Sequence, residues 1–215
     1  MKRATLYAAA AAAAVLAIAG AASAQDFSGP YIGAQVGYAW GDASMPYGNV
    51  GGPFNSTQDD ANIDGVVLGG RAGYNWQSGQ WVFGVEGDIE WTDMNGDDGG
   101  SGGDVNGVDI NWQGSIRGRV GWAFQPDTMI YATAGWQFQD VDASSPADGD
   151  INETIDGAVY GVGFEHRFDD SWTGTIEYRH ADMNQQRFSF PIDGYDEGIE
   201  TDNDSVRLGV NWTFH

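Results

Sequence analysis

The chain has 215 residues, of which 31 are acidic and 9 are basic, a net charge of −22, and no cysteine. Nucleic acid is excluded as a partner, because there is no basic patch that could displace counterions from phosphates. Disulfides and thiolate metal sites are excluded by the missing cysteine. After residue 24 no apolar run reaches the length of a membrane-spanning helix, so any passage through a membrane has to use β-strands.

Residues 1–24 have the pattern of a cleaved secretory signal peptide. A basic start precedes an apolar run over residues 8–19, and Ala22-Ser23-Ala24 forms a small-residue cleavage site. The apolar run is too short for a stable transmembrane helix, although an Ala-rich membrane anchor is an alternative. We therefore predict export, cleavage after Ala24, and a mature β-barrel domain over residues 25–215 in which every basic residue is an arginine.

The first predicted strand covers residues 31–40, where Ile32, Ala34, Val36 and Tyr38 alternate with small or polar residues. Successive side chains of a strand point to opposite faces, so this segment has one apolar and one polar face. Residues 41–64 are rich in Gly, Asp, Asn and Pro and are predicted to form a loop.

Residues 65–91 form the clearest predicted hairpin, because the alternation runs through 66–76 and resumes through 81–91. We interpret residues 77–80 as a four-residue turn. That turn would set Trp76 opposite Trp81 and Arg71 opposite Glu86, which is a favourable cross-strand ion pair. A register shift of one residue would turn every charge to the apolar face.

The same alternation predicts five further strands, over 108–124, 130–139, 158–168, 172–179 and 205–214. In the first of these, the apolar set runs from Ile110 through Trp112 to Trp122. Long connections over 41–64, 92–107, 140–156 and 182–203 alternate with short ones over 77–80, 125–128 and 169–171. The fold class predicted is all-β, an eight-stranded antiparallel up-and-down transmembrane β-barrel, since the strands have about the length that a tilted membrane strand needs, ~9–11 residues.

Aromatic residues concentrate near the strand ends, which is typical of the two aromatic girdles of an outer-membrane barrel. The predicted girdle residues are Trp40, Trp76, Trp81, Trp91, Trp122, Phe138, Phe168, Trp172, Trp212 and Phe214.

The polar strand faces carry arginines and carboxylates in near balance, whereas the excess acids lie in the predicted loops. A water-soluble barrel of the lipocalin or avidin kind would also alternate, but it has no reason to pair its charges on strand faces. A closed lumen has to pair them, and the many glycines on these faces leave room for long side chains. The predicted lumen charge network is Arg71, Glu86, Asp88, Glu90, Arg117, Arg119, Glu165, Arg167, Glu177, Arg179 and Arg207.

The segments GPYIGAQVGYAW, GGRAGYNWQSGQWVFGVEGDIEW, SIRGRVGWAF, TMIYATAGWQF, VYGVGFEHRFDDSWTGTIEYRH and SVRLGVNWTF cover nearly all of residues 25–215 outside the loops. With them the chain resembles the small outer-membrane β-barrel proteins of alphaproteobacteria, porin-family surface antigens related to the OmpA/OmpX-type barrels. The resemblance implies an outer-membrane location and a role as envelope structure, surface antigen or adhesin. It also implies that the barrel-insertion machinery binds the C-terminal strand, although Phe214 is followed here by His215 instead of ending the chain.

Catalytic and metal sites are weakly indicated. His166 and His180 fall on the lipid side of their strands and His215 is terminal, and no histidine lies in a nucleophile motif, so we predict no enzyme and no cofactor. The acidic loops could hold Ca²⁺ or Mg²⁺ or bridge these ions to lipopolysaccharide, but a solvated acidic surface is the simpler interpretation. The loop acids considered are Asp148, Asp150, Glu153, Asp193, Asp196, Glu197, Glu200, Asp202 and Asp204.

Together these features predict an outer-membrane barrel with a structural or surface-interaction role, in contact with lipid and lipopolysaccharide, and monomeric. Its lumen is predicted to be closed by arginine–carboxylate pairs. The alternatives are a narrow porin-like channel and, with less support, a barrel enzyme that modifies lipid A.

Overall fold

The computed structural model describes residues 26–44, 46–49, 51–53, 56–57, 61–96, 107–145, 149–190 and 195–214. The predicted signal peptide and its cleavage site lie outside these residues, as do Asp148, Asp193 and His215. The described part of the chain contains no helix that is long and apolar enough to cross a membrane.

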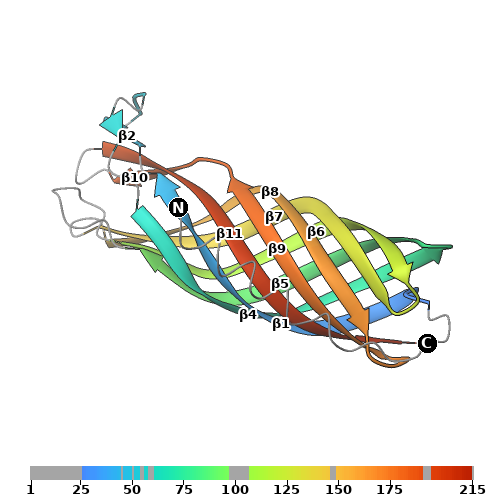
Figure 1. The fold of residues 1–215 in the computed structure, drawn as a ribbon. Helices are drawn as coiled ribbons and strands as arrows, with labels where there is room; N and C mark the ends of the chain where they lie inside the picture. Colours follow the sequence, from blue (N-terminus) through green and yellow to red (C-terminus); the bar gives the residue numbers. More distant parts are fainter. Residues whose placement is uncertain are drawn as a thin grey trace, which may run out of the picture.

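Eight long strands close into one antiparallel barrel, which confirms the predicted fold class (Figure 1). Consecutive strands pair in chain order, and β1 closes the barrel on β11 from Tyr31 opposite Thr213 to Ser44 opposite Glu200. The barrel strands are β1 (Gly29–Ser44), β4 (Ala61–Ser78), β5 (Trp81–Gly96), β6 (Gly107–Gln125), β7 (Thr128–Ser145), β8 (Gly149–Arg167), β9 (Trp172–Met183) and β11 (Tyr195–Thr213).

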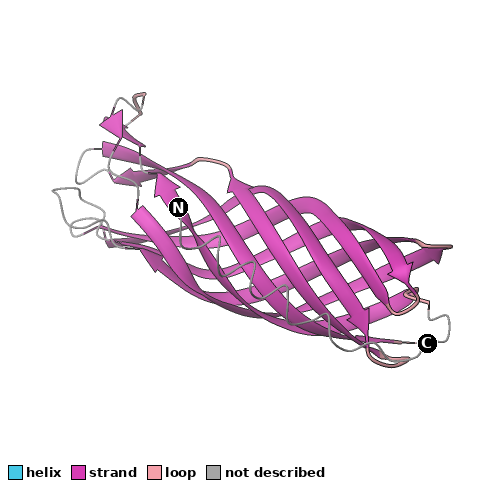
Figure 2. Cartoon of the chain, viewed as in Figure 1, coloured by secondary structure: helices cyan, strands magenta, loops and turns pink. Residues whose placement is uncertain are grey.

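Three short strands lie beyond one end of the barrel: β2 (Pro46–Asn49), β3 (Ser56–Thr57) and β10 (Gln186–Phe190). β2 and β10 both pair with the first residues of β11, and β3 pairs with β2. Almost all of the described chain is therefore strand, joined by brief turns (Figure 2).

The turns Gly79-Gln80 and Pro126-Asp127 and the turn over 168–171 lie at the end of the barrel that also holds Phe214 (Figure 1). The longer connections lie at the opposite end. Outer-membrane barrels place their short turns in the periplasm and their long loops outside the cell. We name the two ends periplasmic and extracellular accordingly.

The predicted register of the first hairpin is wrong by two residues. Ser78 lies opposite Trp81, and Arg71 lies opposite Asp88 instead of Glu86. The reason is that the turn has two residues and not four, with Gly79 at a φ of +61°, a conformation that glycine adopts without strain. A shift of two residues preserves the face of every side chain, so the inward and outward sets are unchanged.

The predicted outward position of Ile110 is also wrong, because a β-bulge reverses the alternation near the start of β6. Trp112 lies opposite Asp140 while Ile110 lies opposite Val141, which leaves Asn111 as an extra residue. Asn111 and Trp112 are both exposed, and Ile110 turns inward with 1% of its surface exposed.

The strands extend well into the segments that were predicted to be loops. β5 continues to Gly96 and β7 to Ser145, whereas β8 already begins at Gly149 and β11 at Tyr195. Strands of 16 to 19 residues exceed the ~9–11 that a membrane strand needs, so the barrel wall rises beyond the membrane.

Candidate functional site

The outer wall of the barrel is apolar from the periplasmic end to beyond the middle of the barrel. Ile116 has 69% of its surface exposed, Trp91 has 65%, and Leu68 has 58%. In water such a continuous apolar surface would drive aggregation, whereas lipid is its natural solvent. The outer wall therefore faces a bilayer, and the alternative of a water-soluble barrel is wrong.

All ten predicted girdle residues lie on this outer wall in two belts at different heights. The periplasmic belt contains Trp76, Trp81, Trp122, Phe168, Trp172, Trp212 and Phe214. The extracellular belt contains Trp40, Trp91 and Phe138. Trp112 and Trp136 also face outward at the level of the extracellular belt, and the sequence interpretation did not include them.

Inside the barrel, Arg117 of β6 is the centre of the charge network. Its Nη1 donates to Glu177 Oε1 at 2.7 Å, and its Nη2 donates to Asp88 Oδ2 at 2.9 Å and also to Glu86. These carboxylates come from β5 and β9, so one guanidinium joins opposite sides of the lumen. All four side chains are at most 2% exposed.

Arg207 and Glu90 form the second centre. The Arg207 guanidinium donates from Nε and Nη2 to the two oxygens of Glu90, and Gln35 and Gln113 donate to the same oxygens at 2.8 Å. The carboxylate thus has four donors. Charge-assisted bonds of this two-point kind are among the strongest in proteins.

Arg179 connects the two centres, because it donates to Asp88 Oδ2 at 3.1 Å, to Glu177, and to Gln35 Oε1 at 3.3 Å. Arg71 donates to Asn211 Oδ1 at 2.7 Å and to Thr175 Oγ1 at 2.6 Å.

Two further arginines lie nearer the periplasmic end. Arg119 pairs with Glu165 and stacks on the ring of Tyr131, with its Cζ 3.8 Å from the ring centroid. Arg167 is buried but donates to main-chain carbonyls at the periplasmic mouth. The structure therefore places all eleven residues of the predicted network on the inner face. Hydrogen bonds link seven of them into one continuous network, namely Glu86, Asp88, Glu90, Arg117, Glu177, Arg179 and Arg207.

The glycines of the inner face make room for these long side chains. A Cβ at Gly209 would lie 2.4 Å from Arg71 Nη2 and 2.8 Å from Thr175 Oγ1. Both atoms are fixed by their hydrogen bond, so a larger residue at position 209 has to displace the guanidinium.

Above the charge network, the extracellular part of the lumen is filled by apolar side chains that the sequence interpretation did not find. Their exposed fractions are 2% or less. Seven of them alternate with outward polar residues in the extracellular parts of the strands, whereas Ala39, Val67 and Val159 lie just below, between outward apolar or aromatic residues. This inner apolar layer consists of Ala39, Ile63, Val67, Met94, Ile110, Val141, Ile155, Val159, Ala181 and Met183.

At the same height the outer wall changes from apolar to acidic. Each of the eight barrel strands contributes at least one outward aspartate, and three pairs lie directly opposite each other in the register. This acidic collar consists of Asp42, Asp64, Asp93, Asp109, Asp140, Asp142, Asp156, Asp182, Asp202 and Asp204. The polarity of the wall therefore changes along the barrel: below the collar the outside is apolar and the inside charged. At the collar the outside is acidic and the inside is mainly apolar and uncharged, with Gln139, Thr201 and Asn203 as buried polar residues among the apolar ones.

Outward aromatic side chains near the collar donate hydrogen bonds to its carboxylates. Tyr178 Oη lies 2.6 Å from Asp204 Oδ1, and Trp136 Nε1 lies 2.7 Å from Asp156 Oδ2. His180 Nδ1 is 2.9 Å from the same Asp204 oxygen. His180 is thus part of the lipid–water boundary.

His166 also belongs to the outer wall, at the periplasmic end. Only 9% of its surface is exposed. The Thr128 hydroxyl oxygen lies 3.0 Å from its Nδ1, and Phe168 packs edge-on against its ring. The two histidines are on different levels of the wall and do not form one site. Among the described residues, no group of three or more Asp, Glu or His side chains is arranged to hold a metal ion.

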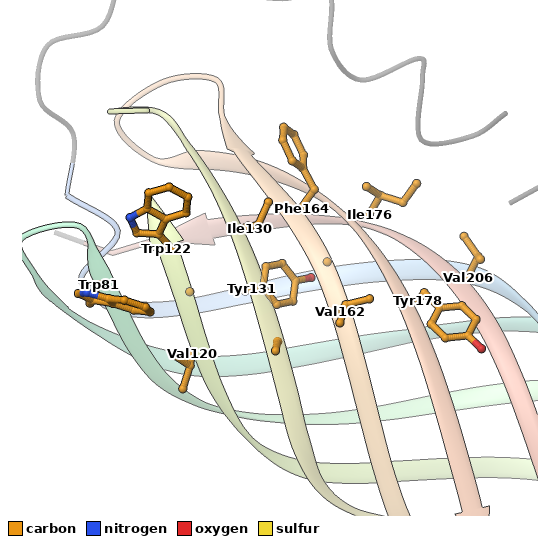
Figure 3. A pocket seen from close by; sticks show the side chains of 13 residues that line it. Trp81, Val120, Trp122, Ile130, Tyr131, Val162, Phe164, Ile176, Tyr178 and Val206 are labelled. Atoms are coloured by element: carbon orange, nitrogen blue, oxygen red, sulfur yellow. The ribbon is translucent and has the colours of Figure 1, made fainter. Parts of the chain in front are cut away.

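An apolar groove of about 790 Å³ crosses the outer wall between Trp122 and Tyr178 (Figure 3). Phe164 and Val162 line it from β8, and Tyr131 lies behind it. Its lining residues carry no charge, so it offers a surface for lipid chains and no acid–base chemistry.

Comparisons with known proteins give one consistent result. A family model for the outer membrane protein beta-barrel domain matches residues 8–214. A 22 kDa outer membrane protein of Rhizobium leguminosarum bv. viciae is 36% identical over 163 residues, which span 76% of this chain and 72% of that protein. A 31 kDa outer-membrane immunogenic protein of Brucella melitensis biotype 1 is 27% identical over 202 residues, with 87% of this chain and 84% of the relative covered.

Among solved structures, the outer membrane protein OprG of Pseudomonas aeruginosa aligns with a TM-score of 0.60 at 13% identity. The alignment covers 90% of this chain and all of OprG. At this identity the likeness concerns the fold alone.

Proposed function

The chain belongs to the outer membrane protein β-barrel family and is an outer-membrane protein, as its resemblance implied, and we propose that it serves as a closed barrel with a structural and surface-interaction role. The observation that carries this proposal is the filling of the lumen. Buried side chains occupy it at the extracellular, central and periplasmic levels.

An eight-stranded barrel leaves an interior just wide enough for side chains to fill. In this chain the central level holds guanidinium and carboxylate groups that are bonded to each other from opposite walls. Opening a water path would require these mutually bonded groups to separate, so their pairing favours a closed lumen. The inner apolar layer adds a second barrier that water does not enter.

The upper part of the barrel supports the surface role. Its strands are continuous with the membrane strands, so the acidic collar is carried by a rigid wall and not by loops alone. The collar follows the extracellular belt, at the level where the head groups of lipopolysaccharide would lie. Lipopolysaccharide is the contact partner that we propose. The names of the Brucella relatives describe immunogenic proteins, which agrees with a surface that is reached from outside.

No acid–base pair in a cleft supports an enzymatic role among the described residues, and we propose that the protein is not an enzyme. The C-terminal strand β11 ends at an outward aromatic side chain, Phe214, with 39% of its surface exposed. We propose that the barrel-insertion machinery binds this strand.

Conductance tests the closed lumen. Purified protein in planar bilayers is expected to give no stable single-channel steps. Stable steps whose size changes in Arg71→Ala or Glu86→Gln would instead establish the narrow porin.

Complementation of a deletion strain separates surface from transport roles. We expect the deletion to increase sensitivity to detergent and to large antibiotics. A folded lumen variant, Glu90→Gln with Arg207→Met, should restore resistance, whereas Asp42→Asn with Asp182→Asn and Asp202→Asn should not. The reverse result, with the collar variant active and the lumen variant inactive, would contradict the surface role.

A further inference from the structure

The residues that precede the first strand are part of the folded barrel. Phe27 lies two residues before β1, yet only 1% of its surface is exposed. Its ring belongs to an apolar cluster with Val82 of β5, Ala123 of β6 and Met129 of β7. These three side chains are the inward residues closest to the periplasmic turns, so Phe27 fills the periplasmic mouth.

Hydrogen bonds from main-chain amides to side-chain oxygens hold the segment against β4. The amide of Phe27 donates to Gln77 Oε1 at 2.7 Å, and the amide of Gln77 donates to Ser28 Oγ at 2.8 Å. Gly29 then turns the chain into β1 with a φ of +124°. A Cβ at Gly29 would be strained and would lie 3.0 Å from the Phe214 carbonyl oxygen.

Arg167 fixes the segment from the other side of the mouth. Its Nη2 donates to the Asp26 carbonyl at 2.8 Å, and its Nη1 donates to the Asp170 carbonyl at 2.8 Å. Its Cζ lies 4.9 Å from the centroid of the Phe27 ring, within the range of a cation–π contact. Arg117 and Arg207 bond lumen carboxylates, whereas Arg167 ties residues 26–28 to the β8–β9 turn.

We propose that residues 26–28 form a stopper, which closes the periplasmic mouth independently of the charge network. The contacts of the stopper come from five strands, β4 to β8. All of its contacts are therefore present only once these five strands have assembled. While it is seated, Met129 and the side chains around it are shielded from periplasmic water.

The absence of cysteine makes a single-thiol measurement possible. The Met129→Cys thiol is expected to react slowly with a membrane-impermeant maleimide in the folded full-length protein, and at least ten times faster when Phe27→Ala is added. The matched control is Val67→Cys, a fully buried position in the inner apolar layer, whose rate should not change with Phe27→Ala. Heat-modifiable migration on gels verifies that each variant is folded.

Arg167→Gln provides a second route that leaves the apolar cluster intact, and it serves if Phe27→Ala does not fold. It should also accelerate labelling of Met129→Cys, by a smaller factor. Equal labelling rates with and without either substitution, in folded protein, would overturn the stopper. Acceleration at Val67→Cys as well would mean general loosening and would equally overturn it. Neither result bears on conductance, because the charge network and the inner apolar layer remain in place.

Discussion

Arg207 and Glu90 face each other across the lumen with two parallel hydrogen bonds, from Nε to Oε1 and from Nη2 to Oε2, both 2.8 Å long. The pair is almost fully buried, with side-chain exposures of 2% and 1%. Taking both groups out of water is costly, and each is tolerated because the other is present. Substitutions in this pair therefore test how much the buried charges contribute to the stability of the barrel.

Arg207→Met should lower the free energy of unfolding by about 3–5 kcal/mol, because it leaves the Glu90 carboxylate without its cation. The double variant Arg207→Met with Glu90→Gln should recover most of the loss, since no buried charge remains. Urea titrations in lipid vesicles would measure both. A double variant that loses more unfolding free energy than the two single variants lose together would contradict this account.

Asp88→Asn and Asp204→Asn make the same chemical change in two environments. Asp88 accepts hydrogen bonds from Arg117, Arg179 and Ser115 in the lumen. The loss of its charge should therefore lower the free energy of unfolding by about 3 kcal/mol. Asp204 is 35% exposed and bonds Tyr178 and His180 at the wall surface, where such contacts contribute about 0–1 kcal/mol. Equal effects in unfolding titrations would show that the lumen is wet.

Gly209→Ala should destabilise the barrel by about 1–3 kcal/mol, because the new methyl group overlaps the Arg71 guanidinium. Gly70→Ala is the matched control on an open part of the outer wall, where the new Cβ would lie 3.7 Å from the Gly33 carbonyl oxygen, an ordinary van der Waals distance. There the substitution should be neutral or slightly stabilising. Melting curves followed by gel migration would separate the two.

Ile110 and Ile116 lie on the same strand but face opposite sides, with 1% and 69% of their surfaces exposed. Single cysteines at the two positions are expected to differ in a bilayer. The Ile116→Cys thiol should react with a lipid-soluble reagent, and the Ile110→Cys thiol should be protected from lipid-soluble and water-soluble reagents alike. Labelling of the second thiol from lipid would mean that the bulge at Asn111 is absent.

The part of the barrel from the periplasmic end up to the collar could be predicted because one rule governs it. Apolar residues face lipid, and a shift of one residue would turn charged side chains into the membrane. That rule assigned Arg117 and Glu177 to the same interior although 60 residues separate them. The error of two residues in the first hairpin did no harm, since an even shift leaves Arg71 and Asp88 facing inward.

The upper part could not be predicted by the same rule, because the rule reverses there. In the segment 61–67 the alternation continues, but Ile63 and Val67 are now the inward residues and Asp64 faces out. A search for outward apolar residues ends the strand at this point and assigns a loop. Ile110 was misplaced for a local reason, since nothing in the sequence marks Asn111 as the extra residue of a bulge.

Phe27 was missed for a third reason: it lies outside any periodic segment. A single aromatic residue between the predicted cleavage site and a strand has no pattern that reveals its partners. Its position depends on Gln77 of β4 and Arg167 of β8, which are distant from it in the sequence and lie near it only in the folded barrel.

The inversion of wall polarity also fixes the depth of the barrel in the membrane. If the barrel moved toward the periplasm by one pair of residues, collar carboxylates such as Asp64 and Asp182 would enter the hydrocarbon layer. If it moved outward, the tryptophans of the periplasmic belt would leave the membrane–water interface. Sliding in either direction is opposed, so the molecule has a single resting height. Because ten aspartates must pass the bilayer once to reach that height, insertion has to be assisted, and afterwards the same side chains act as a latch against return.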